Sequence, residues 1–411
     1  MKRNLGSRLS ALRQSGEIKT GRQVAEELKE GARADLFPGE GREEETAYGR
    51  CYMREIKFPL DYKHGGSCLS GFLSCSGPEL ALPARDEGLC SFKPGSTAFL
   101  DIETTGLSGG AGTWAFLIGL GWSESDFFVL RQYFLRRPAE ERAILSHFQA
   151  SVSAYPAVVT FNGKLFDLPL IRNRQVLAGF SPMEPDQHLD LLQCARALWK
   201  KRLASRSLRS IEEALLNIKR SDDIPGAEIP EVYFSYLRRG ETGLLKKVFH
   251  HNVLDILSMA TLLERIYRTT AGQLAKHPAE ALALGCLCLE RGRSAEGIEH
   301  LREASNGAPD PAAEEAALKL SFYFKRQGRW DEAVKIWEET AAKNPRNIPA
   351  LVELAKYYEH REGRYQTALE LTERALNLSG IKNAAQPGNY SEFSTPALLH
   401  RLNRLNRRLG A

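Results

Sequence analysis

Short runs of hydrophobic residues, separated by Gly-rich or polar breaks, mark the middle of this chain. Three such runs follow one another at Ala98–Ile102, Thr113–Gly121 and Phe127–Phe134, and their close spacing predicts an antiparallel meander. A fourth run, Ala157–Phe161, is apolar throughout, which is typical of a strand buried on both faces. These four runs predict a sheet at the centre of the chain.

Apolar stripes at helical spacing lie between and after the predicted strands. One opens after Pro138, and proline is common at the first position of a helix. The others cover residues 168–177, a stretch from about Ser207, and a long stretch over residues 244–267. This order predicts an α/β domain over residues 96–270, in which helices flank a mixed sheet.

Beyond Ala271 the strand patterns end and Gly-Arg pairs recur. The pairs begin at Gly292, Gly328 and Gly363, close to the 34-residue period of the tetratricopeptide family, which this region resembles. The third repeat departs from the pattern because it lacks the proline that follows the other two. The resemblance implies an all-α solenoid of about three repeats over residues 277–380, closed by a capping helix over residues 394–411.

The N-terminal part carries weaker patterns. Residues 1–45 are charged and Gly-rich, so we expect a flexible segment with a short helix near Val24–Leu28. Residues 46–95 mix short apolar runs with Gly, Ser and Pro, which predicts a small extension of strands and turns. With 411 residues, the chain is expected to contain more than one domain.

Composition narrows the functional classes without choosing one. The 56 basic residues exceed the 51 acidic ones by only five, which permits a polyanionic partner without requiring one. Seven cysteines, an odd number spread along the chain, do not resemble a disulfide framework. No apolar run approaches the roughly 18 residues that a membrane helix needs, so we expect a cytoplasmic protein.

A pair of carboxylates at the end of the first predicted strand is the clearest chemical signal. Asp101 and Glu103 are separated by one residue, so both side chains project from the same face of the strand. Carboxylates that share a site repel each other unless a proton or a cation relieves the repulsion. Because Mg²⁺ and Mn²⁺ prefer oxygen ligands, the pair indicates either a metal site or a solvated strand end.

Two later segments carry carboxylates on predicted helices. Asp167 follows the buried strand at the entry of a helix, where it could also act as an N-cap. Asp255 interrupts an apolar stretch of the long helix, where a solvated role is less natural. His251 precedes Asp255 by four residues and shares its helix face, whereas His250 would reach the site if the helix began later.

In this order, the three segments resemble the exonuclease motifs of the DEDD superfamily, which has the ribonuclease H-like fold. The motifs are Asp101-x-Glu103, Asn162-x₄-Asp167 and a histidine followed by Asp255. A narrower resemblance, to bacterial YprB-like ribonuclease H-like proteins, is carried by residues 101–112, 158–169, 188–192, 223–226 and 251–257. The resemblance extends over about residues 96–267.

This resemblance implies a metal-dependent nuclease that uses two Mg²⁺ or Mn²⁺ ions. It assigns the ions to four carboxylates, namely Asp101, which would bridge both, and Glu103, Asp167 and Asp255. A histidine, either His250 or His251, would orient or deprotonate the attacking water. The implied reaction is 3′-to-5′ exonuclease cleavage.

Residues near the motifs are expected to contact nucleic acid, with a single-stranded end as the favoured substrate. Five of them lie in or beside the motifs: Thr104, Gly106, Asn162, Lys164 and Phe166. A basic cluster after the second motif adds Lys200, Lys201 and Arg202, with Trp199 as a candidate stacking ring, although a solvated helix face with Trp199 in the core is nearly as consistent with the pattern. The Gly-rich run 108–112 lacks a following Gly-Lys-Ser/Thr and is therefore not a nucleotide P-loop.

Two alternatives to the exonuclease remain open. One is a binding module that has lost turnover, and the other is a structure-selective endonuclease on the same fold. The full set of four carboxylates favours an enzyme over the binding module. The repeats are expected to dock a protein partner or to help capture substrate, and the sequence patterns do not distinguish DNA from RNA.

Overall fold

This computed structural model describes residues 41–106, 112–274, 277–306, 310–383 and 393–410. The chain divides into two compact units, Met1–Leu274 and Ala275–Ala411, and each has a hydrophobic core. Most of the segment expected to be flexible (1–45), with its short helix, lies outside the described residues. The same holds for most of the Gly-rich run 108–112.

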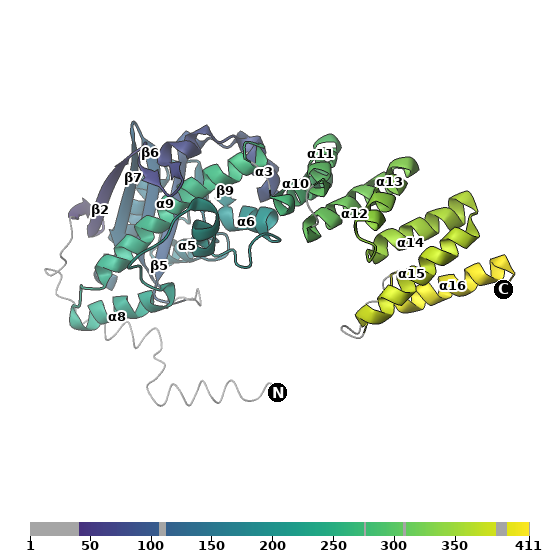
Figure 1. The fold of residues 1–411 in the computed structure, drawn as a ribbon. Helices are drawn as coiled ribbons and strands as arrows, with labels where there is room; N and C mark the ends of the chain where they lie inside the picture. Colours follow the sequence, from purple (N-terminus) through teal and green to yellow (C-terminus); the bar gives the residue numbers. More distant parts are fainter. Residues whose placement is uncertain (1–40, 107–111, 275–276, 307–309, 384–392, 411) are drawn as a thin grey trace, which may run out of the picture. The chain divides into compact units, whose positions relative to one another are not determined.

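A seven-stranded mixed sheet forms the centre of the first unit, in the order β1-β2-β7-β6-β5-β8-β9 (Figure 1). Its strands are β1 (Arg42–Thr46), β2 (Gly49–Pro59), β5 (Thr97–Thr104), β6 (Ala115–Glu124), β7 (Phe127–Phe134), β8 (Ala157–Thr160) and β9 (Gln187–Asp190). Strands β5, β6 and β7 pair antiparallel, which confirms the predicted meander. The apolar strand β8 is buried throughout and joins β5 in parallel, as its composition predicts.

Helices cover both faces of this sheet, which confirms the predicted fold class. Gln132 and Tyr133 are neighbours on β7 and therefore point to opposite faces. The Gln132 amide donates to the main chain of α9 (Leu245–Thr270), whereas the Tyr133 ring contacts Phe148 of α4 (Glu141–Val152). Both helices match the apolar stripes in the sequence, and the sheet lies between them.

Shorter helices connect the strands of the first unit. They are α5 (Asp167–Leu177), α6 (Leu191–Trp199), α7 (Leu208–Ile211), a π-helical turn (Glu212–Leu216) and α8 (Ile229–Arg239). The sequence patterns predict α5 and the start of α7 but neither β9 nor α8. Strand β9 has only four residues, which is too short for a periodic signal.

Residues 46–95, for which the sequence predicts strands and turns, belong to the first unit. Strand β2 pairs with β7 from Tyr52 to Pro59, so the segment widens the main sheet. The following residues form the short hairpin β3 (Lys63–His64) and β4 (Ser67–Cys68), then short helices that include α3 (Gly77–Ala84). Phe72 in this stretch is buried against Phe99 of β5, so the segment contributes to the core.

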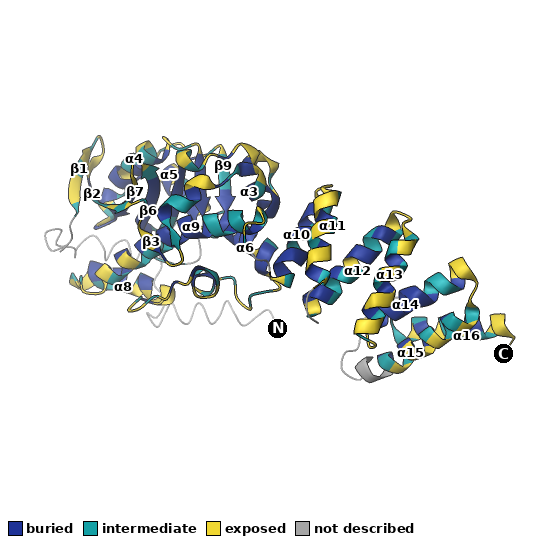
Figure 2. Cartoon of the chain, turned by 45° about the horizontal axis from the view of Figure 1, so that its top comes forward, coloured by how far each residue is buried: buried dark blue, intermediate teal, exposed yellow. Residues whose placement is uncertain are grey.

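Consecutive α-helices make up the second unit, and along its described residues each packs against the next. They are α10 (Pro278–Glu290), α11 (Ser294–Ser305), α12 (Pro311–Arg326), α13 (Trp330–Lys343), α14 (Ile348–Tyr357), α15 (Tyr365–Asn383) and α16 (Thr395–Leu409). Helix α14 is buried along most of its length (Figure 2). Within the described ranges, no helix of either unit combines the length and apolar character needed to cross a membrane.

The glycines that mark the sequence repeat have a structural cause. Gly292, Gly328 and Gly363 lie in the turns that separate α10 from α11, α12 from α13 and α14 from α15. Their φ angles are +74°, +72° and +67°, in the left-handed region that glycine adopts without steric cost. The repeat in the sequence is therefore a repeat of helix-pair turns.

Candidate functional site

The carboxylates singled out in the sequence come from three elements of the first unit. Asp101 and Glu103 project from β5, Asp167 begins α5, and Asp255 lies in the middle of α9. Burial, and then the negative charges of Asp255 and Asp167, raise the pKa of Asp101 well above its usual range. Burial and the charge of Asp101 likewise raise the pKa of Glu103. The four groups are therefore close enough to repel one another, and a cation would relieve that repulsion.

A buried amide fixes the position of Asp101. The Asn252 Nδ2 atom on α9 lies 2.8 Å from Asp101 Oδ2 and 3.3 Å from the Asp101 carbonyl oxygen. Asn252 Oδ1 in turn accepts from Gln132 Nε2 at 2.8 Å. Gly119 makes this approach possible, because a Cβ there would lie 2.3 Å from Asn252 Oδ1. These hydrogen bonds tie β5 and β7 to α9.

Only one of the two candidate histidines faces the carboxylates. Helix α9 is continuous from Leu245, so His250 is exposed while His251 turns toward Asp255, with 3.6 Å between His251 Nε2 and Asp255 Oδ2. The other ring nitrogen, Nδ1, lies 2.8 Å from Asp223 Oδ1. Burial would raise the pKa of Asp223, but its hydrogen bonds to His251 and Arg220 lower it.

The guanidinium of Arg220 lies among three carboxylates, those of Glu212, Asp223 and Asp255. Its Nε lies 2.7 Å from Glu212 Oε2, its Nη1 lies 3.2 Å from Asp223 Oδ2, and its Nη2 donates to Asp255. Burial would lower the pKa of Arg220, but Glu212 and Asp255 raise it, so the guanidinium stays charged. Sequence reasoning missed this residue because the polar stretch around Arg220 resembles a solvated loop.

Asp190 organises the loop that leads to Asp167. Its carboxylate accepts from the main-chain N–H groups of Asn162 at 2.8 Å and Lys164 at 3.1 Å, and it caps α6 through Leu192 N at 3.0 Å. Asn162 adopts a left-handed φ of +69° in this tight loop. Burial and the negative charge of Asp190 raise the pKa of Asp167 to about 7. Asp190 is thus a structural partner of this loop.

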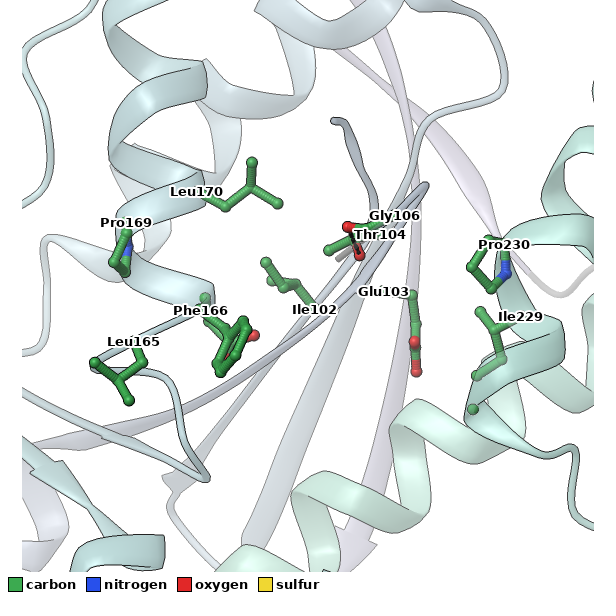
Figure 3. A pocket seen from close by; sticks show the side chains of 12 residues that line it. Ile102, Glu103, Thr104, Gly106, Leu165, Phe166, Pro169, Leu170, Ile229 and Pro230 are labelled. Atoms are coloured by element: carbon green, nitrogen blue, oxygen red, sulfur yellow. Dashed lines mark hydrogen bonds between the residues drawn. The ribbon is translucent and has the colours of Figure 1, made fainter. Parts of the chain in front are cut away.

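A pocket of about 350 Å³ opens beside Glu103 and Asp167. Thr104 and Gly106 line it, and so do apolar residues from α5, the preceding loop and α8. Figure 3 shows Leu165 and Phe166 on one side of Glu103 and α8 residues on the other. Leu165 is 65% exposed and Phe166 is 49% exposed, so the loop presents apolar surface next to carboxylates. The pocket therefore combines apolar surface with carboxylates, which would repel an anionic ligand unless a cation lay between them.

The basic cluster predicted after the second motif does not join this pocket. Trp199 is fully buried in the core, so it is not a stacking ring, which corrects the expectation from the sequence. Lys200 and Lys201 are exposed and Arg202 is half-buried where α6 ends, and none of the three lines the pocket. The apolar periodicity of α6 explains the burial of Trp199.

The donor set fits a hard divalent cation by chemistry and charge. All four carboxylates offer oxygen, and three of them have pKa values raised by burial and by their neighbours. Among the described residues, however, no three His, Cys, Asp or Glu side chains lie close enough together in their present positions to hold an ion. Binding therefore requires side-chain movement, for which Asp255 would have to share or exchange its contact with Arg220.

A mixed seven-stranded sheet with helices on both faces, and with paired carboxylates on its interior strand β5, fits the ribonuclease H-like class of domains. Residues 98–267 match the model of the RNase H superfamily. The chain is also 32% identical to "Uncharacterized protein YprB" of Bacillus subtilis (strain 168) over 373 residues, which are 87% of this chain and 86% of YprB. The chain therefore belongs to the same family as YprB. Members of the RNase H superfamily are generally nucleases and usually use divalent metals.

Proposed function

We propose that this protein is a metal-dependent nuclease that shortens single-stranded nucleic acid from a 3′ end. The observation that carries the proposal is a set of four carboxylates on β5, α5 and α9, three of which, Asp101, Glu103 and Asp167, have pKa values raised by burial and by neighbouring negative charges. A bound cation would relieve the repulsion between these carboxylates, and their oxygen donors suit Mg²⁺ or Mn²⁺.

Within this proposal, two bound ions would lower the pKa of water and stabilise charge on the leaving oxygen of the phosphodiester. Asp101 is the residue proposed to bridge them, with Glu103, Asp167 and Asp255 as the other ligands. Asn252 holds one oxygen of Asp101 at 2.8 Å and so limits its rotation. Asp101 therefore starts from a fixed orientation, whereas Asp255 would have to share or exchange its contact with Arg220.

His251 is the proposed base. In the neutral ring, donation from Nδ1 to Asp223 leaves the lone pair on Nε2, which faces Asp255 and the site. Nε2 can then accept the proton of the attacking water. Asp223 is a positioning residue because it sets the tautomer and the orientation of the ring.

The pocket next to Glu103 supports cleavage at a strand end. Its apolar loop, with Leu165 and Phe166 exposed, can pack against a terminal base while the phosphate faces the carboxylates. Thr104, Gly106, Asn162 and Lys164 are proposed to contact the same nucleotide. The direction of cleavage rests on the resemblance to DEDD exonucleases.

The second unit is proposed to be a tetratricopeptide-like domain that docks a partner or captures substrate. Its support is the recurrence of a helix pair joined by a left-handed glycine, three times in succession. Helix α16, whose Leu398 and Leu405 are buried, is the proposed cap of this array.

The test is cleavage of end-labelled single-stranded and duplex DNA and RNA in Mg²⁺ or Mn²⁺. We expect metal-dependent, stepwise shortening that Asp101→Asn abolishes, since the amide keeps the side-chain shape but removes the ligand charge. Asp222→Asn is the matched control because Asp222 is 82% exposed. Absence of cleavage with every substrate and both metals refutes the nuclease, and mid-strand cuts refute the exonuclease mode.

A further inference from the structure

Three arginine guanidinium groups lie over aromatic rings in the C-terminal part of the second unit. They are Arg361 over Trp330 at 4.6 Å, Arg364 over Tyr358 at 4.8 Å, and Arg408 over Tyr365 at 5.1 Å from guanidinium carbon to ring centroid. A guanidinium held over a ring has less freedom to lose when it binds an anion. The three arginines are therefore preorganised rather than freely mobile.

Three of the aromatic rings on this part of the unit contact one another in series. Trp330 stacks on Tyr357 with centroids 6.2 Å apart, and Tyr357 meets Tyr358 at 5.6 Å. Arg408 also donates to the Tyr365 hydroxyl at 3.2 Å, which joins the end of α16 to the start of α15. We call the set Trp330, Tyr357, Tyr358, Arg361, Arg364, Tyr365 and Arg408 the arginine–aromatic surface.

The charge on α16 reinforces this surface. The helix carries Arg401, Arg404, Arg407 and Arg408 and no acidic residue. Two of its arginines, Arg401 and Arg404, hold the carboxylate of Glu359, which is 2% exposed and anchors the helix. Arg407 and Arg408 are exposed. Two acids border the surface: Glu362 accepts from the Tyr357 hydroxyl at 2.9 Å, and Glu338 accepts from the Tyr358 hydroxyl at 3.0 Å.

We propose that the arginine–aromatic surface binds single-stranded nucleic acid and captures the substrate of the nuclease. This inference rests on the proposed function. Guanidinium edges suit phosphate oxygens, and guanidinium planes backed by rings offer flat faces on which unpaired bases stack. An acidic protein segment would use the charges but not the flat faces, so dependence on bases separates the two partners.

The experiment measures binding without cleavage. The full chain carrying Asp101→Asn is titrated in EDTA against a labelled single strand of about 20 nucleotides, at several salt concentrations. We compare Arg361→Gln/Arg364→Gln/Arg408→Gln with a control that removes equal charge elsewhere on the unit, Lys319→Gln/Lys335→Gln/Arg346→Gln, whose three residues are exposed. The first set is expected to weaken binding by at least about tenfold and to reduce the salt slope by about 2, from roughly 0.7 per phosphate contact.

A second comparison tests the stacking. Lysine at the three arginine positions keeps the charge but loses the plane, so the salt slope should stay while the preference for a normal over an abasic strand disappears. Equal binding by the glutamine set and its control overturns the inference, and so does equal binding of normal and abasic strands by the unsubstituted surface. Cleavage by the otherwise native protein is assayed separately. If the protein cleaves no substrate, only the proposed nuclease activity is refuted. If it cleaves but the glutamine variants bind the strand as well as the unsubstituted protein does, only the proposed capture surface is refuted.

Discussion

Removal of the Arg220 guanidinium should destabilise the first unit strongly. The Arg220 side chain is 3% exposed and its partner Glu212 is fully buried, so Arg220→Met leaves a carboxylate without its cation in the protein interior. Breaking a buried pair in this way costs about 3–5 kcal/mol. For a unit of this size, that corresponds to a fall in melting temperature of roughly 10 °C.

A double-mutant cycle identifies the cause. Glu212→Gln removes the stranded charge, so in the Arg220→Met background it should recover at least half of the lost stability. Arg238→Met is the matched control, because its ion pair with Glu231 is exposed (43% and 70%) and should contribute less than about 1 kcal/mol.

Differential scanning calorimetry of the full chain follows the transition of the first unit, with that of the second unit as an internal reference. The reasoning is wrong if Arg220→Met behaves like Arg238→Met, or if Glu212→Gln lowers stability further in the Arg220→Met background. Either result would mean that Glu212 finds another partner or a proton at little cost.

Three further predictions follow from the site. The pKa of Asp167 is raised to about 7, so the contribution of its protonated form to the stability of the metal-free protein is lost as pH rises from about 4 to 7. Mn²⁺ should therefore raise the melting temperature more at about pH 8 than at about pH 5.5. Equal increases in melting temperature at the two pH values would contradict this. Burial lowers the pKa of His188 to about 4, so the contribution of His188 to the free energy of unfolding is present above about pH 6.5 and is lost as pH falls from about 6.5 to about 4. In urea unfolding, His188→Gln should therefore lose less stability over this pH range than the unsubstituted protein does. Gly119→Ala places a methyl group 2.3 Å from Asn252 Oδ1, so it should lower the free energy of unfolding by about 1–3 kcal/mol and weaken Mn²⁺ binding measured by calorimetry. The control Gly95→Ala, which has open space around it, should change neither quantity.

Most of the sheet and its main helices could be predicted from periodicity. The meander, the buried strand β8 and helix α9 each have long or uniform apolar patterns, which burial imposes directly on the sequence. Strands β1 and β2 were not placed in the sheet because pairing with β7 depends on contacts distant in the chain. The sequence carries no local signal for such a pairing.

Some residues of the candidate site could also be predicted from the sequence, and others could not. The motif carboxylates could be found because paired acids on one strand face are unusual without a cation. Continuity of α9 decides geometrically between His251 and His250, which spacing alone left open. Arg220 and Asn252 were missed because a polar residue next to other polar residues resembles solvated surface until the fold buries it.

The hydrogen bond between Asn252 and Asp101 joins residues 151 positions apart in the chain. His251 and Asp255 lie on the same late helix, so a ribosome must complete α9 before the site can assemble. A growing chain that already contains Asp101 and Glu103 therefore lacks the base and one proposed ligand. For a protein proposed to cut nucleic acid, the proposed site is therefore incomplete until late in synthesis.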